Sequence, residues 1–226
     1  MAFFIYIGFM QTHHLSIEFK ARFSTLGELT SSTKQIWFVL HGYGQLAPYF
    51  IHKFDKLKDN SVYVIAPEGL SRFYTEPLQS TGRSNDRVGA SWMTKENRLV
   101  DIENYITYLN TLHANQVDNN CKVPTTILGF SQGAATASRW VSTGNVPFER
   151  LILWSGVFPH DMNFESGRQS LHGKEVSIVY GKNDPFLEDS QFESLREVSS
   201  KLGITPEYVS FDGGHEIDEK TLQNFL

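Results

Sequence analysis

The stretch that decides the fold is Thr126-Ile-Leu128, followed by Gly129-Phe-Ser131-Gln-Gly133 and then by Ala134-Ala-Thr-Ala-Ser138. The first segment has the composition of a buried strand, and the alanine-rich last segment that of a helix able to pack closely against a sheet. A Gly-x-Ser-x-Gly pentad between a strand and a helix is typical of a nucleophile elbow, a tight turn with serine at its apex. This context predicts Ser131 as a nucleophile; the alternative is a glycine-lined turn with an incidental serine.

Outward from this turn, short apolar runs alternate with segments of helical spacing, which predicts an α/β fold with a mostly parallel central sheet and helices on both faces. The apolar runs, each expected to form a strand, are 36–40, 62–66, 126–128, 151–154, 176–180 and 208–211. An earlier strand is predicted where apolar residues alternate from Leu15 to Phe23. The expected helical stripes are Leu99, Ile102, Ile106 and Leu109, and Phe192 to Leu202, which Gly203 closes. No repeat or linker divides residues 1–226, so a single domain is expected.

A serine nucleophile needs a base, and the base needs an acid to orient it. The usual chain order on such a sheet is serine, acid, histidine. Asp184 follows the predicted strand 176–180, at the carboxyl edge where open parallel sheets place their sites. Asp161, after the preceding strand, is the alternative acid. His215 follows the last predicted strand and two glycines, and is the predicted base.

Two backbone N–H groups are also needed to hold a tetrahedral oxyanion. Gln132, directly after the serine, is expected to supply one of them. The second is expected from Tyr43, because Leu40-His-Gly-Tyr43-Gly-Gln45 follows a predicted strand and contains two glycines. His41 precedes the serine and does not fit the chain order of a base, so a structural role is expected for it.

The connection 67–95 has no clear period and is predicted to be an irregular loop on the substrate side of the sheet. Its aromatic and apolar residues, Phe73, Tyr74, Trp92 and Met93, are expected to line an acyl pocket. The alternative is that they pack the loop onto the body of the protein. Because the chain has little room for a lid domain, short to medium acyl groups are expected.

Composition narrows the class of protein. The 226 residues are 40% hydrophobic and carry a formal charge of −5. Because nucleic-acid-binding proteins normally have a basic face, no nucleic-acid partner is expected. The single cysteine, Cys121, favours a reducing compartment, and a cytoplasmic location is expected. No metal-ligand spacing is present, so neither a metal nor an organic cofactor is expected. Residues 1–10 are apolar but too few to span a bilayer. They also lack the basic start of a signal peptide, so they are interpreted as a first strand or as an extension before a start at Met10; a cleaved signal or a lipid anchor is the alternative.

Taken together, LHGYGQ at 40–45, GFSQG at 129–133, GKNDP at 181–185 and GGHE at 213–216 resemble the phospholipase/carboxylesterase family, small α/β hydrolases that include the acyl-protein thioesterases. The resemblance covers residues 37–216. It implies the α/β-hydrolase fold and a serine carboxylesterase acting on a small ester. It also implies a triad of Ser131, Asp184 and His215, with the amides of Tyr43 and Gln132 as the oxyanion hole.

This sequence departs from the family at Gln45, where aspartate is common, and within 67–95, where the thioesterases differ. Thioesters, lysophospholipids, peptides and lactones remain alternative substrates for the same triad. A non-catalytic binding protein on the same fold is the alternative from another class. The sequence leaves the oligomeric state open, a homodimer included.

Overall fold

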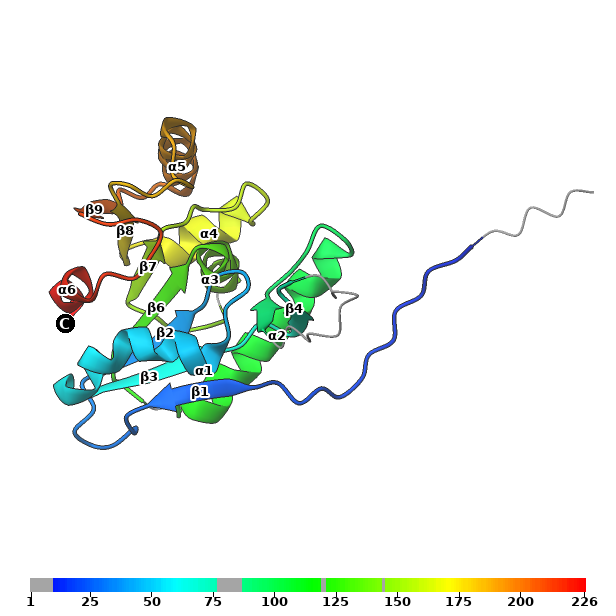
Figure 1. Ribbon diagram of the computed structural model, residues 1–226, viewed down its shortest axis with the longest axis horizontal. Coiled ribbons are helices and arrows are strands. Elements are labelled where there is room, and N and C mark those ends of the chain that lie inside the picture. Colours follow the sequence, from blue (N-terminus) through cyan, green and yellow to red (C-terminus); the bar gives the residue numbers. More distant parts are fainter. Residues whose placement is uncertain (1–9, 77–86, 119–120, 144) are drawn as a thin grey trace, which may run out of the picture.

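A sheet of seven strands, in the order β1-β3-β2-β6-β7-β8-β9, forms the centre of the molecule (Figure 1). The structure is a computed structural model and describes residues 10–76, 87–118, 121–143 and 145–226. β1 runs antiparallel to β3, and every other pairing in this sheet is parallel. The strands are β1 (Phe23–Leu26), β2 (Gln35–Leu40), β3 (Val62–Pro67), β6 (Thr125–Phe130), β7 (Arg150–Trp154), β8 (Glu175–Gly181) and β9 (Glu207–Phe211).

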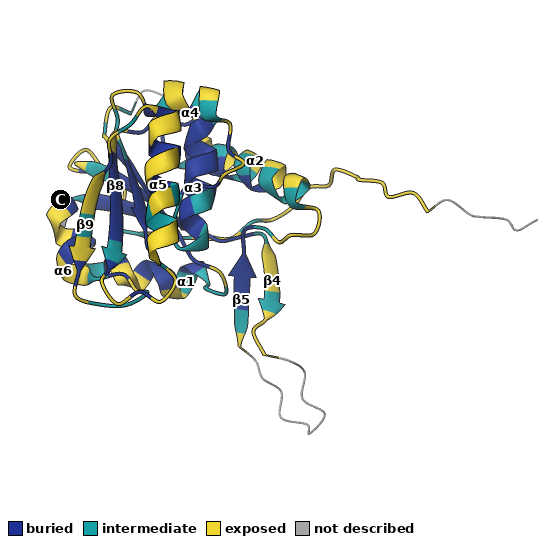
Figure 2. Ribbon diagram, turned by 90° about the horizontal axis from the view of Figure 1, so that it is seen from above, coloured by how far each residue is buried: buried dark blue, intermediate teal, exposed yellow. Residues whose placement is uncertain are grey.

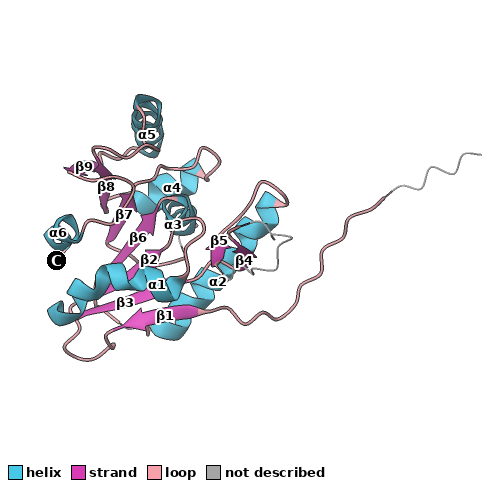
Figure 3. Cartoon of the chain, in the orientation of Figure 1, coloured by secondary structure: helices cyan, strands magenta, loops and turns pink. Residues whose placement is uncertain are grey.

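Helices cover both faces of the sheet, which confirms the predicted fold class (Figure 3). Alternate residues of β2 show why two layers are needed: Ile36 and Phe38 enter one core, and Trp37 enters the other. The first core packs under α2 (Arg98–Gln116), α3 (Gln132–Ser142), α4 (Phe164–Leu171) and α5 (Asp189–Leu202). The second packs under α1 (Ala47–Phe50), the 3-10 helix η1 (Ile51–Asn60), α6 (Glu219–Leu222) and the 3-10 helix η2 (Gln223–Phe225).

Each of the predicted apolar runs lies within a strand of this sheet, and the stripe ending at Leu202 lies on α5. Gly203 ends α5 with a φ of 67°, the left-handed conformation that favours glycine at this position. In the described part of the chain, no helix combines the length and the apolar character needed to cross a membrane.

The first predicted strand is shorter than the alternation of apolar residues indicated. Strand β1 begins only at Phe23, which is paired with Pro67 at the end of β3, so residues before Phe23 have no more of β3 to pair with. Leu15 and Ile17 are therefore exposed. The predicted stripe on α2 is confirmed at Ile102, Ile106 and Leu109, which pack in or against the core, but not at Leu99, which lies in the first turn and is 76% exposed.

The connection 67–95 was expected to be irregular, but its described ends form a hairpin. Strand β4 (Ser71–Tyr74) pairs antiparallel with β5 (Val88–Ser91), and Figure 2 shows the pair projecting beside the main sheet. Each strand has only four residues, too few to show a clear period in the sequence. Residues 77–86 of this connection, and residues 1–9, for which a first strand or an extended start was expected, lie outside the described residues.

Candidate active site

Ser131 occupies a strained turn between β6 and α3. Its φ of 54° and ψ of −117° are rare for a residue with a side chain, and such strain costs about 1–3 kcal/mol. The turn is held by the Ser131 N–H, which donates to the carbonyl of Trp154 on β7 at 2.9 Å. Gly129 is required here, because a Cβ at that position would lie 2.2 Å from the carbonyl oxygen of Gly133. The strand, turn and helix predicted around Ser131 are therefore all present.

Asp184 and His215 meet at the same edge of the sheet, after β8 and β9. The His215 Nδ1 lies 3.0 Å and 2.9 Å from the two carboxylate oxygens of Asp184. The Asp184 side chain is fully buried, whereas that of His215 is 21% exposed. The Phe186 N–H donates to Asp184 Oδ1 at 2.9 Å and so helps to fix the carboxylate. The ring centroids of Phe130, at the end of β6, and of Phe186, after β8, lie 4.9 Å and 4.7 Å from the centroid of the His215 imidazole.

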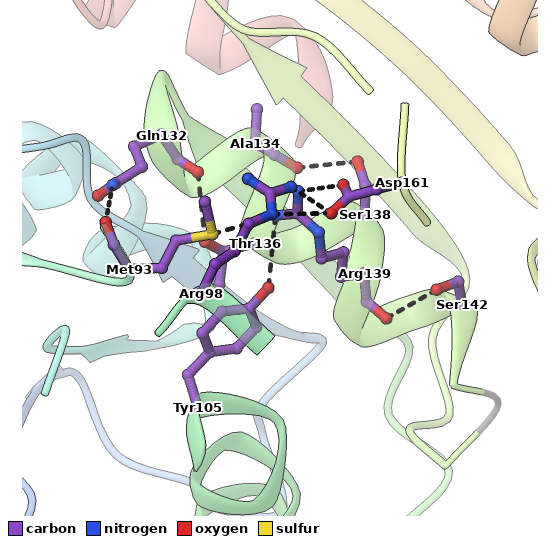
Figure 4. A network of polar contacts seen from close by, with 10 residues as sticks. All are labelled: Met93, Arg98, Tyr105, Gln132, Ala134, Thr136, Ser138, Arg139, Ser142 and Asp161. Carbon is purple, nitrogen blue, oxygen red and sulfur yellow. Dashed lines mark hydrogen bonds and ion pairs between the residues drawn. The ribbon is translucent and has the colours of Figure 1, made fainter. Parts of the chain in front are cut away.

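Asp161, the alternative acid, lies in a different network (Figure 4). Arg139 Nη2 donates to its Oδ1 at 2.6 Å, and Arg98 pairs with its Oδ2. Burial acts to raise the pKa of Asp161, but the hydrogen bonds and charges of Arg139 and Arg98 outweigh it and hold the pKa below its ordinary value. Of the two candidate acids, the structure brings Asp184 to His215 and keeps Asp161 ionised between two arginines.

The loop after β2 lies against the serine. A Cβ added to Gly42 would be 3.1 Å from the Cβ of Ser131, so this backbone passes next to the nucleophile turn. The amides on either side of Tyr43 are both engaged: Gly42 N–H donates to Gln45 Oε1 at 2.8 Å, and Gly44 N–H to the carbonyl of Ala90 at 2.9 Å. The loop is thus fixed by its own Gln45 and by strand β5.

His41 has the structural role expected for it. Its Nε2 accepts a hydrogen bond from Gly69 N–H at 2.9 Å, and its Nδ1 donates to the carbonyl of Gly42 at 2.7 Å. Both bonds require a neutral ring with the proton on Nδ1. Burial lowers the pKa of His41 to about 4, in agreement with that form. The residue ties the loop of Tyr43 to the end of β3.

The side chain of Gln132 has a role that the sequence did not indicate. It donates to the carbonyl of Met93 at 3.0 Å and accepts from Trp92 N–H at 3.1 Å, and so clamps the segment after β5 to the start of α3. Gln45 was likewise noticed only as a departure from the family. The contacts of Gln132 with Trp92 and Met93 join residues 40 and 39 positions apart, and no motif marks them. The contact of Gln45 with Gly42 is local, within the same loop.

The four residues expected to line an acyl pocket lie in different environments. Trp92 is only 2% exposed and donates from Nε1 to the carbonyl of His41 at 2.8 Å, so it supports the loop from within the core. Phe73 stacks on the exposed ring of Tyr43, with centroids 5.0 Å apart, and Tyr74 is 61% exposed. Met93 lines a pocket of about 330 Å³ that also touches Gln132. For Trp92 the structure therefore supports the alternative, that the residue packs the loop onto the body of the protein.

The fold is that of the α/β-hydrolase esterases. The chain matches the family model described as Serine hydrolase (FSH1) over residues 30–224, and it belongs to that family of serine hydrolases. Among solved structures, esterase PE8 is 22% identical with a TM-score of 0.64, over 92% of this chain and 96% of that chain. An acyl-protein thioesterase 2 from Zea mays is 16% identical with a TM-score of 0.67, over 91% and 96%. A carboxylesterase from Mesorhizobium loti is also 16% identical, with a TM-score of 0.65, over 91% and 92%.

No curated protein sequence matches the chain. The family match and the shared fold confirm the predicted class of enzyme, an esterase-like serine hydrolase. Within the ranges that the structure describes, no group of three or more His, Cys, Asp or Glu residues is arranged to hold a metal ion.

Proposed function

We propose that the protein hydrolyses carboxylic esters of short to medium acyl chains, with Ser131, His215 and Asp184 as its triad. The observation that carries this proposal is the pair of contacts between His215 Nδ1 and Asp184 at the sheet edge that also carries the strained Ser131. A buried carboxylate on Nδ1 orients the imidazole and leaves Nε2 for a proton from a serine hydroxyl. Membership of a serine hydrolase family supports the same assignment.

In the proposed reaction, His215 takes the Ser131 proton as the hydroxyl oxygen attacks the ester carbonyl. Asp184 stabilises the imidazolium that forms, and the imidazolium then protonates the departing alcohol. Water, deprotonated by His215, attacks the acyl-enzyme and releases the acid. Atoms balance as one ester and one water giving one acid and one alcohol, and no cofactor enters the scheme.

The oxyanion would be held by the backbone N–H groups of Tyr43 and Gln132. Gln132 is the first residue of α3, where N–H groups have no partner within the helix and the helix dipole favours negative charge. Tyr43 lies between Gly42 and Gly44, whose N–H groups both donate hydrogen bonds within the protein. The loop that carries Tyr43 passes beside Ser131. Donors fixed in this way stabilise a developing charge without having to reorganise.

The acyl group would lie in the pocket beside Gln132 and Met93. Its volume of about 330 Å³ is at the small end of the range for ligand pockets, which supports a short to medium acyl chain. Phe73 and Tyr74, nearer the loop of Tyr43, would contact the alcohol portion or the outer part of the substrate.

The proposal is tested by labelling with a fluorophosphonate probe and by measuring kcat/KM for 4-nitrophenyl acetate, butyrate, octanoate and palmitate, with the matching thioesters alongside. We expect labelling, and a rate that rises with chain length and then stops rising before palmitate. A rate still climbing at palmitate would contradict the short pocket. Absence of both labelling and turnover would contradict the esterase itself.

A further inference from the structure

The pocket beside the nucleophile turn has an apolar part and a charged part. Its apolar walls come from Met93, Ala135 and the segment from Val157 to Pro159 after β7. Gln132, next to Ser131, lies at one end of the face that α3 presents to the pocket, and Arg139 lies seven residues further along the same helix. Because seven residues are almost two full turns, both side chains line the pocket.

The charged part holds more positive than negative charge. Among the lining residues, two guanidinium groups, Arg98 and Arg139, share the single carboxylate of Asp161, as Figure 4 shows. The Arg139 side chain is only 7% exposed, whereas the side chains of Arg98 and Asp161 are 35% and 37% exposed and lie at the open side of the cluster. Its remaining contacts are weak: Nη1 lies 3.5 Å from the Tyr105 hydroxyl and 3.8 Å from the Met93 sulfur.

One donor of this cluster has no partner at all. Arg139 Nε is buried, and in the described part of the chain it has no hydrogen-bond partner. A buried guanidinium normally satisfies its donors, since leaving one unsatisfied is unfavourable. The surplus charge and the unused donor together point to an anionic ligand in the pocket.

We propose that this pocket selects acyl groups that end in a carboxylate, so that the preferred substrates are half-esters of short dicarboxylic acids. The inference rests on the proposed ester hydrolysis and names its substrate class. Water would add across the ester bond to release the alcohol and the free diacid, while the distal carboxylate, paired with the guanidinium groups, takes no part in bond making. The negative charge of the ligand would balance the surplus positive charge.

The geometry of α3 sets the length of the diacid. Ser131 and Arg139 are eight residues apart, about 12 Å along the helix axis. Helical side chains lean back toward the N-terminus, which brings the guanidinium nearer to Ser131 than its Cα. With C–C bonds of about 1.5 Å, diacids of about four to six carbons would reach from Ser131 to the guanidinium groups.

The test compares kcat/KM for phenyl hydrogen glutarate and for the neutral phenyl methyl glutarate, with phenol release as the readout. Reactions with Ser131→Ala supply the background, because half-esters of short diacids also hydrolyse unaided. We expect the wild-type enzyme to prefer the half-ester about tenfold, the value of one charge-assisted hydrogen bond. This preference should fall in Arg98→Gln, rise in Asp161→Asn, and stay at the wild-type value in Arg168→Gln, which removes a guanidinium from α4 outside the pocket.

A binding measurement separates failure of this inference from failure of the proposed function. Free glutarate should raise the melting temperature of Ser131→Ala, and should raise it less in Ser131→Ala combined with Arg98→Gln. Turnover of the neutral ester with no half-ester preference and no glutarate shift would overturn the inference while the esterase stands. A glutarate shift without turnover of either ester would support the carboxylate pocket and overturn the esterase.

Discussion

Ser131 and Ser155 follow neighbouring strands, β6 and β7, and both adopt a positive φ, 54° and 49°. Their surroundings differ. Ser131 is partly exposed beside the pocket, whereas Ser155 is 3% exposed, and its hydroxyl has no partner among the described residues. A strained serine at the carboxyl edge therefore does not by itself identify a nucleophile; access to substrate distinguishes the two.

Two histidines at this edge show the same contrast. His215 is partly exposed, and its Nδ1 faces a carboxylate. His41 is fully buried, and backbone groups occupy both of its nitrogens. The accessible residues, Ser131 and His215, are the ones proposed to act in catalysis, and the buried residues, Ser155 and His41, have surroundings typical of structural support.

Removing each serine hydroxyl in turn tests which of the two serines is the nucleophile. Ser131→Ala should abolish fluorophosphonate labelling and lower kcat by about 10⁴-fold or more, because the proposed nucleophile is removed. Ser155→Ala, the matched control, should keep its labelling. Labelling that survives in Ser131→Ala and disappears in Ser155→Ala would reverse the assignment.

The next effect concerns the acids. Asp184→Asn should lower kcat for a neutral ester by about 10³-fold to 10⁴-fold, because an amide favours the wrong tautomer of His215. Asp161→Asn should cost far less with the same ester, since its carboxylate pairs with Arg98 and Arg139 rather than with a histidine. Circular dichroism checks that both variants are folded. If Asp161→Asn then lowers kcat more than Asp184→Asn does, Asp184 is the wrong acid.

The sequence was sufficient where a single local pattern determines the structure. The strand, the Gly-x-Ser-x-Gly turn and the small residues after it lie next to one another, so β6, Ser131 and α3 could be predicted together. The positions of Asp184 and His215 followed from their places after predicted strands, because parallel strands bring their carboxyl ends to one edge. The periodic stripe of α5 was sufficient for the same reason.

The sequence was insufficient where partners are distant. Whether Leu15 lies in a strand depends on where β3 ends, at Pro67, and the hairpin depends on the pairing of Ser71–Tyr74 with Val88–Ser91. An aromatic residue such as Trp92 in a segment without periodicity gives no sign of which side it faces. The contact of Arg139 with Asp161 joins residues 22 positions apart, and no motif marks it.

The third prediction tests how the two serine turns depend on each other. A Cβ on Gly156, next to Ser155, would lie 2.5 Å from the Ala134 Cβ and 2.7 Å from the Ser131 carbonyl oxygen. Gly156→Ala must therefore displace the nucleophile turn, and we expect it to lower kcat by about tenfold or more and stability by about 1–3 kcal/mol.

Gly173→Ala is the control for this substitution. Its φ is 72°, and an added Cβ would meet nothing within 4 Å, so it should cost about 1 kcal/mol of backbone strain and leave kcat unchanged. Urea denaturation and ester hydrolysis measure both quantities. If kcat is unchanged in Gly156→Ala, as in Gly173→Ala, the two serine turns are independent.

The fourth prediction concerns the pH dependence of stability that the buried His41 causes. The pKa of His41 is about 4 in the folded protein and 6.5 without perturbation, so the unfolded chain binds the proton more readily. The free energy of unfolding is therefore not reduced by His41 above pH 6.5, and it falls as the pH falls toward 4. At pH 5 this decrease amounts to about 2 kcal/mol relative to pH 7. His41→Gln keeps an acceptor for Gly69 N–H but does not titrate, so its free energy of unfolding should fall by about 2 kcal/mol less than that of the wild type over this interval. Urea unfolding at pH 7, 6 and 5 measures the difference. If His41→Gln follows the wild-type pH dependence, the ring does not enter the fold neutral, and the Nδ1–H tautomer assigned to His41 is wrong.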